Sequence, residues 1–329
     1  MRICRSSGRR KCLCQNYFEG ATAKIKSTYS KDEIAEFLSN KYGEPIAPIP
    51  MAEGMESQAL SFTRGGQEFV LRINPLIEGF RKDDYAYRNF SSAKIPIPKI
   101  IEYGNFSAGH AFCISEKAPG NTYQDADEAT VVTLAKDVLA LFFEISEIDI
   151  SGTTGYGIFS SETGNAPFGS WRECLLSILD ERVYAWEKVK QTQGVDTELL
   201  DRIMSAFSAL VEYCPEARKL RHGDFGTNNL LVDRGALKLT AVIDWDNASY
   251  GDPLYDMGGA YFWRTWLMCV EKTIPIWEEK FSGAPNYRER TMCYQLHLGL
   301  SEIYENALDG DMETLQWCQE RCRQILDAY

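Results

Sequence analysis

Hydrophobic and polar positions follow different rhythms in the two halves of the chain. Up to residue 116, short runs rich in Val, Ile, Phe and Thr are separated by turn residues, a pattern that is typical of strands. Beyond residue 120, apolar residues recur at helical spacing over long stretches. The pattern therefore predicts an α+β, two-lobe fold, with a β-rich N-lobe followed by a mainly helical C-lobe.

The first half predicts a small antiparallel sheet accompanied by helices. Ser30 and Glu33 have the spacing of a capping box, which predicts a helix that begins there. The runs 59–63 and 68–74 flank a Gly-Gly pair, and this arrangement predicts a hairpin. The remaining predicted elements are a helix over 83–92 and strands over 99–104 and 111–116.

In the second half, one hairpin over 229–232 and 239–242 interrupts the helical pattern. Helices are predicted over 129–147, 171–190, 197–214, 288–308 and 312–328. Lys-Ala-Pro-Gly at 117–120 is the predicted hinge, so we expect an N-lobe over 30–116, a C-lobe over 121–329 and a disordered basic extension over 1–29. Ligands usually bind in a cleft between such lobes.

Composition narrows the class of protein. The formal net charge of -12 argues against a nucleic-acid partner, because binding to phosphate backbones needs a basic surface. No apolar run is long enough to cross a membrane, and the basic start lacks the apolar stretch of a signal peptide. The 10 cysteines are scattered and are expected to be reduced thiols. We therefore expect a monomeric protein of the cytoplasm.

The residues with the clearest chemical meaning surround the C-lobe hairpin. The stretch 222–229 reads HGDFGTNN, and 242–245 reads VIDW after the hairpin. Phosphoryl transfer needs a carboxylate that orients the attacking hydroxyl and accepts its proton, together with oxygen ligands for Mg²⁺ on the nucleotide phosphates. Asp224, Asn229 and Asp244 supply these groups, and the hairpin returns the chain so that Asp244 faces the other two.

These residues resemble the catalytic and metal-binding loops of the aminoglycoside phosphotransferase family, whose fold is protein-kinase-like. The resemblance implies that Asp224 is the catalytic base, that Asn229 and Asp244 bind Mg²⁺, and that ATP or GTP is the co-substrate. The runs that look like the hygromycin B branch of the family lie at 51–62, 69–74, 87–98 and 261–266, spread over the chain beyond its first 29 residues. Hygromycin B is therefore the expected acceptor and antibiotic resistance the expected role.

The same resemblance implies a nucleotide site in the N-lobe. Arg72 stands where protein kinases carry a phosphate-anchoring Lys, and its guanidinium offers a bidentate fork. Its helix partner falls on Asp83, with Asp84 as the alternative. Ser57 ends a loop over the phosphates, although 53–57 also fits an ordinary turn. In the hinge, Glu116 and Ala118 are expected to bind the base through their main chain.

On the acceptor side the resemblance implies substrate contacts in the C-lobe. The residues concerned are Asn228, Asp246, Trp263, Arg264 and Trp266. Aromatic faces and carboxylates suit the ammonium groups of an aminocyclitol, but the two tryptophans also fit plain core positions. His222, Asp252 and Asp256 are interpreted as structural residues that brace the catalytic loop.

Two other functions fit parts of the sequence. A kinase of choline, fructosamine, a macrolide or another metabolite would keep the chemistry and change the acceptor, since a fold does not fix a substrate. A silent binding module would be expected to lack one of the three residues at the phosphoryl site, and all three are present.

Overall fold

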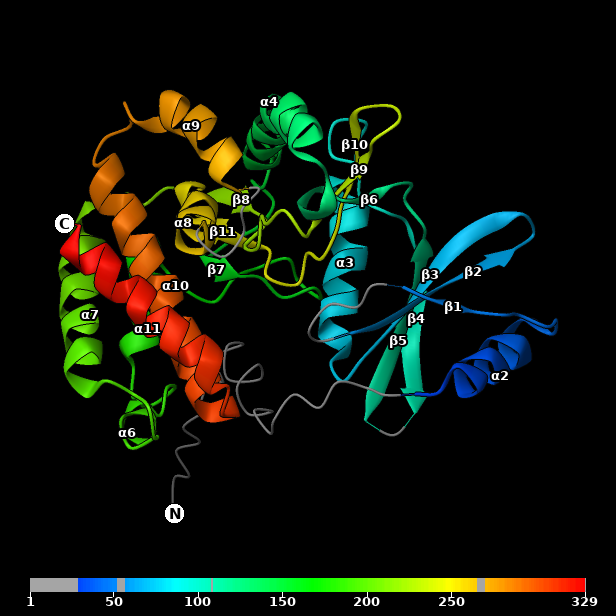
Figure 1. The fold of residues 1–329 in the computed structure, drawn as a ribbon, viewed down its shortest axis with the longest axis horizontal. Helices are drawn as coiled ribbons and strands as arrows, with labels where there is room; N and C mark the ends of the chain where they lie inside the picture. The colour runs from blue at the N-terminus through cyan, green and yellow to red at the C-terminus, as the bar shows by residue number, and fades with distance from the viewer. Residues whose placement is uncertain (1–28, 52–56, 108, 265–269, 329) are drawn as a thin grey trace, which may run out of the picture.

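The N-lobe, here residues 29–116, is built on a five-stranded antiparallel sheet (Figure 1). The computed structural model describes residues 29–51, 57–107, 109–264 and 270–328. Its N-lobe strands are β1 (Ile49–Pro50), β2 (Gln58–Arg64), β3 (Gln67–Asn74), β4 (Ile100–Ser107) and β5 (His110–Glu116), in the order β1-β2-β3-β5-β4. Helix α2 (Lys31–Tyr42) covers one face and shares a core with the sheet through Ile34 and Leu38.

Local signals at the start of the chain produce the expected structures. Ser30 accepts a hydrogen bond from the backbone of Glu33, whose carboxylate binds the backbone of Ser30 in return, so the predicted capping box is confirmed. The β2–β3 hairpin turns at Gly65 and Gly66, which have φ angles of 57° and 79°. Two successive positive φ values suit a tight hairpin turn and favour glycine.

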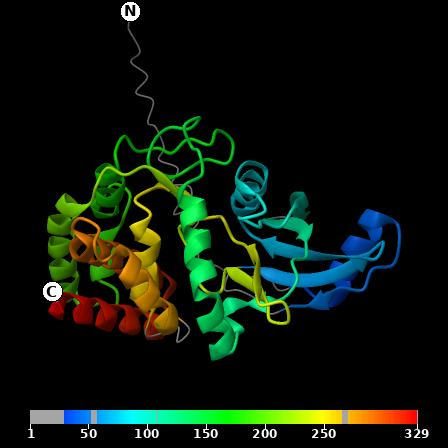
Figure 2. The same cartoon turned by 90° about the horizontal axis from the view of Figure 1, so that it is seen from above.

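Helix α3 (Ile77–Phe90) lies between the sheet and the C-lobe (Figures 1 and 2). It begins six residues before the predicted start, because Asn74 accepts a hydrogen bond from Leu76 N–H at 2.8 Å and turns the chain out of β3. Near its start, Phe80 packs with Ile100 of the sheet, whereas Phe90 at its end belongs to the C-lobe core. The helix therefore joins the two lobes through its packing.

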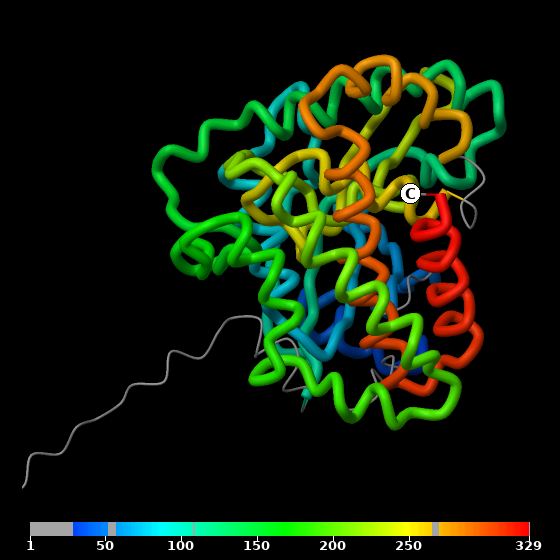
Figure 3. Tube along the Cα trace, turned by 90° about the vertical axis from the view of Figure 1, so that its left-hand side faces the viewer, coloured from blue at the N-terminus to red at the C-terminus, as the bar shows by residue number. Residues whose placement is uncertain are grey.

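The C-lobe, here residues 121–328, contains the helices that follow α3 along the chain. They are α4 (Glu128–Ser146), α5 (Trp171–Leu176), α6 (Trp186–Lys190), α7 (Thr197–Leu210), α8 (Leu254–Trp263), α9 (Val270–Phe281), α10 (Tyr287–Asp309) and α11 (Met312–Asp327). Figure 3 shows α7, α10 and α11 side by side, as their mutual contacts require. None of the described helices has both the length and the apolar character that crossing a bilayer demands.

Short strands complete the C-lobe. The predicted hairpin is formed by β9 (Leu230–Asp233) and β10 (Lys238–Val242), and β6 (Asn121–Thr122) pairs with β9. A second sheet of β7 (Gly157–Ile158), β11 (Ser249–Gly251) and β8 (Lys219–Arg221) was not predicted. Strands of two or three residues are too short to show an alternating pattern, so the sequence carries no signal for this second sheet.

The single helix predicted over 171–190 is wrong. Helix α5 ends at Leu176, a 3₁₀ turn follows over Ser177–Leu179, and α6 starts only at Trp186. Asp180 breaks the helix, because its carboxylate accepts a hydrogen bond from Arg182 N–H at 3.0 Å and its carbonyl binds Val183 N–H at 2.9 Å. A side chain that bonds to the backbone two residues on favours a turn over a continued helix.

Candidate active site

The β9–β10 hairpin brings Asn229 beside both ends of the predicted constellation. The Nδ2 atom of Asn229 donates to the Asp224 carboxylate at 2.8 Å and to the Asp224 carbonyl at 2.9 Å. The carbonyl of Asn229 in turn accepts from Ile243 N–H at 2.9 Å, one residue before Asp244. Hydrogen bonds thereby link Asn229 directly to Asp224, and to Asp244 through its neighbour Ile243.

Asp244 has a left-handed backbone, with a φ of 66°. This conformation is unfavourable for a residue with a side chain and persists where the surroundings hold it. Residues on each side of Asp244 are held, since Ile243 N–H binds Asn229 and Trp245 N–H binds Asp83 at 2.9 Å. The turn therefore sets the direction of the Asp244 side chain through its neighbours.

The glycine of the HGD motif is required by close packing. Gly223 has a φ of 86°, and a Cβ atom added to it would lie 1.9 Å from the carbonyl oxygen of Asn247. Only a glycine allows the catalytic loop to pass this close to the segment that follows Asp244. This contact gives a physical reason for glycine at this position.

His222 and Asp256 brace the catalytic loop, as predicted. His222 is fully buried, and its Nε2 atom lies 3.0 Å from the Ile243 carbonyl. The Asp256 carboxylate accepts hydrogen bonds from the N–H groups of His222 and Gly223, both at 3.0 Å. Burial raises the pKa of Asp256 to about 6, against the opposing effects of Arg221 and of these two N–H groups.

Asp252, the third predicted brace, is buried in an ion pair with Arg290. Two nitrogen atoms of the guanidinium donate to its carboxylate at 2.7 Å and 2.9 Å, and the hydroxyl of Tyr294 donates to the same group. Both charges lie in the C-lobe core, where an unpaired charge would be strongly destabilising. Asp252 thus links the start of α8 to α10.

On the N-lobe side, Arg72 of β3 forms an ion pair with Asp83 of α3. Asp84, the alternative partner, pairs with Arg88 instead. Burial tends to lower the pKa of the Arg72 guanidinium, but the charges of Asp83 and Asp244 outweigh this effect and raise it, so the group stays protonated. The Arg72 side chain as a whole is 22% exposed.

The other predicted nucleotide contacts lie at the ends of strands β2 and β5 of the same sheet. Ser57 precedes β2, and its hydroxyl accepts a hydrogen bond from Asn74 at 3.1 Å, while the rest of the predicted phosphate loop, 53–56, lies outside the described residues. Glu116 ends β5, with its N–H bound to the Lys99 carbonyl at 2.9 Å. Ala118 follows two residues beyond the last pair of the β3–β5 ladder.

The predicted acceptor residues do not form one cluster. Trp263 stacks on Trp317 of α11, with ring centroids 5.1 Å apart, and Arg264 pairs with Glu271 of α9 at 2.9 Å. These contacts place both side chains against neighbouring helices. The remaining aromatic prediction, Trp266, lies outside the described residues.

Two predicted acceptor residues do lie next to the phosphoryl site. Asn228 donates from its Nδ2 atom to the Oδ1 atom of Asn229 at 3.3 Å. Asp246 lies two residues after Asp244, and its carboxylate lies close to Gly79 of α3, where an added Cβ atom would be 3.2 Å from the Asp246 Cγ atom. Burial raises the pKa of Asp246 to about 6.

Lys82 binds the segment that follows Asp244, a contact that was not predicted from the sequence. Its Nζ atom donates to the carbonyl groups of Asp246 and Ala248, the latter at 2.8 Å, and the side chain is 1% exposed. Burial lowers the pKa of Lys82 to about 7. A lysine on a helix normally reaches into water, so its position next to Asp83 was the only available signal.

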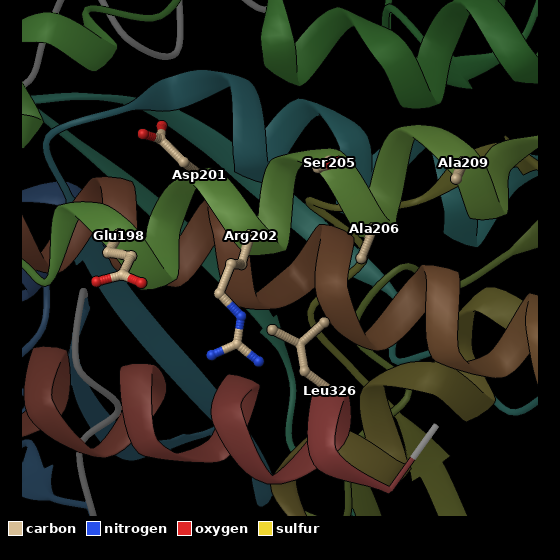
Figure 4. A pocket seen from close by; sticks show the side chains of 7 residues that line it. All are labelled: Glu198, Asp201, Arg202, Ser205, Ala206, Ala209 and Leu326. Atoms are coloured by element: carbon tan, nitrogen blue, oxygen red, sulfur yellow. The ribbon is translucent and has the colours of Figure 1, made fainter.

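Neither of two surface hollows is lined by Asp224, Asn229 or Asp244. A depression of about 590 Å³ lies between α7 and α11, lined by Glu198, Arg202 and Leu326 among others, and none of the predicted site residues borders it (Figure 4). A hollow of about 260 Å³ adjoins the hinge and is lined by Glu116, Ala118 and Thr240 among others. The candidate site is therefore defined by its side chains and not by the larger cavity.

The donor set at the hairpin suits Mg²⁺. Asn229 and Asp244 offer oxygen atoms, and Mg²⁺ binds through one or two protein oxygens while keeping water and phosphate oxygens as its other ligands. No group of three or more His, Cys, Asp and Glu side chains that could hold a metal occurs within the described residues. A metal that brings ligands of its own, as a nucleotide-bound Mg²⁺ does, matches this pair.

A five-stranded N-lobe sheet with an Arg–Asp pair, above a helical lobe that carries HGD and IDW loops on a hairpin, defines a phosphotransferase of the protein-kinase-like fold. The model of the phosphotransferase enzyme family (APH) matches residues 49–274. The chain belongs to this aminoglycoside phosphotransferase family.

Individual relatives agree with the family. The hygromycin-B 4-O-kinase of Escherichia coli is 36% identical over 306 residues, which are 92% of this chain and 86% of that protein. A crystal structure of a thermostable mutant of aminoglycoside phosphotransferase APH(4)-Ia, in ternary complex with AMP-PNP and hygromycin B, matches with a TM-score of 0.82 and 36% identity, covering 90% of this chain and 98% of the other. The aminoglycoside-3'-phosphotransferase of type VIII shares the fold at a TM-score of 0.51 and 17% identity, covering 82% of this chain and 99% of the other.

Proposed function

We propose that the protein transfers the terminal phosphoryl group of Mg²⁺-bound ATP or GTP to a hydroxyl of hygromycin B, and that this reaction protects a cell from the drug. The hydrogen bonds that tie Asn229 to Asp224 and to the residue before Asp244 carry the proposal, because they join a base and two oxygen ligands in one small region. The identity of 36% to a hygromycin-B 4-O-kinase supports the choice of acceptor and of its 4-hydroxyl.

Asp224 has the role of base in this proposal. One oxygen of the Asp224 carboxylate accepts a hydrogen bond from the Asn229 amide. This bond fixes the orientation of the carboxylate before a substrate arrives. The attacking hydroxyl would donate a hydrogen bond to this carboxylate, which would take the proton as the new O–P bond forms. The bond between the terminal phosphorus and the bridging oxygen of the nucleotide would break in the same step, so that ADP or GDP leaves with the electron pair. A bound Mg²⁺, held by Asn229 and Asp244, would supply positive charge that offsets the negative charge on the transferred group.

The N-lobe would hold the nucleotide. Arg72, kept protonated by Asp83, would contact phosphate oxygens, and Ser57 would add a hydroxyl from the start of β2. The main chain of Glu116 and Ala118 would bind the base at the end of β5. These assignments rest on the order of the strands and on the Arg72–Asp83 pair.

The acceptor would lie against the C-lobe, where Asn228 and Asp246 border the phosphoryl site. Carboxylates attract the ammonium groups of an aminocyclitol, and the overall charge of -12 favours a cationic ligand over nucleic acid. Trp263, Arg264 and Trp266 remain proposed acceptor contacts that only the family resemblance supports. We also propose that the protein is a monomer and that it acts in the cytoplasm, where nucleoside triphosphates are available.

The proposal is tested by offering the purified protein Mg²⁺ and ATP or GTP with a panel of acceptors: hygromycin B, other aminoglycosides, choline and a fructosamine. Nucleotide consumption that depends on hygromycin B is the expected result, and a host that expresses the protein should tolerate the drug better than one that expresses Asp224→Asn. Turnover with choline or a fructosamine and none with hygromycin B would reject the acceptor and leave only a small-molecule kinase.

A further inference from the structure

Lys82 places an amino group inside the contact between the two lobes. The side chain is 1% exposed, its Nζ atom donates to the carbonyl groups of Asp246 and Ala248, and it lies 4.7 Å from the centre of the Phe159 ring. Removing an ammonium group from water is unfavourable unless several acceptors replace the water. The two carbonyl groups replace water as hydrogen-bond acceptors for the buried Lys82 amino group.

The carbonyl groups bound by Lys82 belong to the metal loop, defined here as residues 244–248. The next residue of α3, Asp83, accepts a hydrogen bond from Trp245 N–H in the same loop. Adjacent residues of one helix thus bind the loop with opposite polarity, Asp83 as acceptor and Lys82 as donor. Such a pair fixes both the position and the orientation of a peptide segment.

These contacts act directly on the residue that is proposed to bind the metal. Asp244 begins the metal loop in a left-handed conformation, with a φ of 66°, that its neighbours must maintain. Asp83 also forms the ion pair with Arg72. The two residues of α3 therefore connect the proposed phosphate-binding arginine and the proposed metal ligand through one rigid helix.

We propose that Lys82 is a positioning residue for phosphoryl transfer, which fixes the metal loop against α3 and so aligns Asp244 with Arg72 before a nucleotide binds. This inference rests on the proposed function for its meaning in catalysis. Displacement of a reacting group by about 1 Å lowers turnover by about 10²-fold, so a loosened loop should reduce kcat more than it weakens acceptor binding.

Lys82→Met tests this inference, because methionine has a similar length but neither the charge nor the donors. In a folded variant, hydrogen exchange of the Trp245 and Ala248 amides should become at least about tenfold faster without ligand, while exchange in α10 stays unchanged. The value of kcat should fall by about tenfold or more, with KM for the acceptor within about twofold of wild type. Arg81→Met is the matched control, since Arg81 is the preceding residue of α3 and pairs only weakly with Glu78 at 3.6 Å.

Wild-type exchange and kcat in folded Lys82→Met would overturn the inference. Equal acceleration of exchange in the metal loop and in α10 would also overturn it, since it would indicate a general structural role. Because exchange needs no acceptor, the result stands even if hygromycin B proves not to be the substrate.

Gly79→Ala examines the same contact if Lys82→Met does not fold. An alanine there favours the helix, but its Cβ atom would lie 3.2 Å from Cγ of Asp246, so this part of the metal loop must shift by a few tenths of an ångström to make room. Faster exchange at Trp245 and a lower kcat are the expected results. Wild-type values of both quantities in Gly79→Ala would reject the inference.

Discussion

Asp83 of α3 accepts a hydrogen bond from the backbone N–H of Trp245 at 2.9 Å, although 162 positions separate the two residues. The second oxygen of the same carboxylate forms the ion pair with Arg72. One side chain thereby joins the sheet of the N-lobe to the segment that follows Asp244. The geometry around this carboxylate leads to several measurable expectations.

Replacing Arg72 should weaken nucleotide binding. Arg72→Lys keeps the charge but loses the planar fork, so we expect a several-fold higher KM for the nucleotide with part of the activity kept. Arg72→Ala leaves the buried Asp83 without its cation and should raise KM by roughly tenfold or more. Arg88→Ala is the control, because Arg88 pairs with the neighbouring Asp84 on the same helix but is 70% exposed. Unchanged KM values in both Arg72 variants would remove Arg72 from the nucleotide site.

Removal of the two proposed metal ligands should change the dependence on Mg²⁺ to different degrees. Asp244→Ala removes a charged ligand and should abolish both productive nucleotide binding and turnover. Asn229→Ala removes a neutral ligand and should only raise the Mg²⁺ concentration that is needed for the half-maximal rate. Asp233→Asn, at the end of β9, keeps the polar side chain of the hairpin turn and should behave as wild type. If neither ligand variant alters the Mg²⁺ titration, the metal binds elsewhere.

Gly223→Ala should destabilise the fold more than an ordinary glycine substitution does. A Cβ atom there would overlap the Asn247 carbonyl at 1.9 Å, and the φ of 86° is also unfavourable for alanine. Gly65→Ala has a φ of 57° but meets nothing within 4 Å, so it carries only the conformational penalty of about 1–2 kcal/mol. Urea unfolding should give a clearly larger loss for Gly223→Ala, and equal losses would contradict the packing argument.

The stability of the protein should fall in mild acid because of His297. This side chain of α10 lies 2.7 Å from the Tyr255 hydroxyl, and burial, assisted by the nearby charge of Arg221, lowers its pKa from 6.5 to about 3. The unfolded chain then takes up a proton below pH 6.5 that the folded protein refuses until about pH 3, so the stability from neutral His297 is complete above pH 6.5 and decreases as the pH falls.

His297→Gln should remove this part of the acid sensitivity. Between pH 6.5 and about pH 5, wild type should lose roughly 2 kcal/mol of unfolding free energy relative to the variant. The difference is measured by urea titrations at each pH. His222, which is also buried with a lowered pKa, is present in both proteins and cancels in the comparison. Parallel pH profiles of the two proteins would show that folding does not lower the pKa of His297.

The proximity of the proposed phosphoryl-site residues could be predicted from the sequence because they lie close together along the chain. Asp224 and Asn229 share one loop, and a hairpin of alternating residues returns the chain to Asp244, so spacing and local pattern contain the geometry. The capping box at Ser30 and the turn at Gly65 were predictable for the same reason. Each depends on interactions among residues fewer than about ten positions apart.

Features that depend on distant parts of the chain escaped the sequence analysis. The burial of Lys82 depends on carbonyl groups more than 160 positions away, and no local pattern distinguishes it from an exposed lysine of an amphipathic helix. The break between α5 and α6 was missed because a helical periodicity continues through Asp180, whose side chain prefers a turn. The stacking of Trp263 on Trp317 likewise joins α8 to α11 and has no signal in either segment alone.

Mass spectrometry of hygromycin B after incubation with the protein and Mg²⁺-nucleotide tests the central claim most directly. We expect one added phosphoryl group per drug molecule, formed in proportion to the nucleotide consumed. Folded Asp224→Asn should form the product at least about 10²-fold more slowly, since it loses proton acceptance while keeping the proposed metal ligands. Hygromycin B that keeps its original mass with the folded wild-type protein, or product formed at the wild-type rate by Asp224→Asn, would contradict the account.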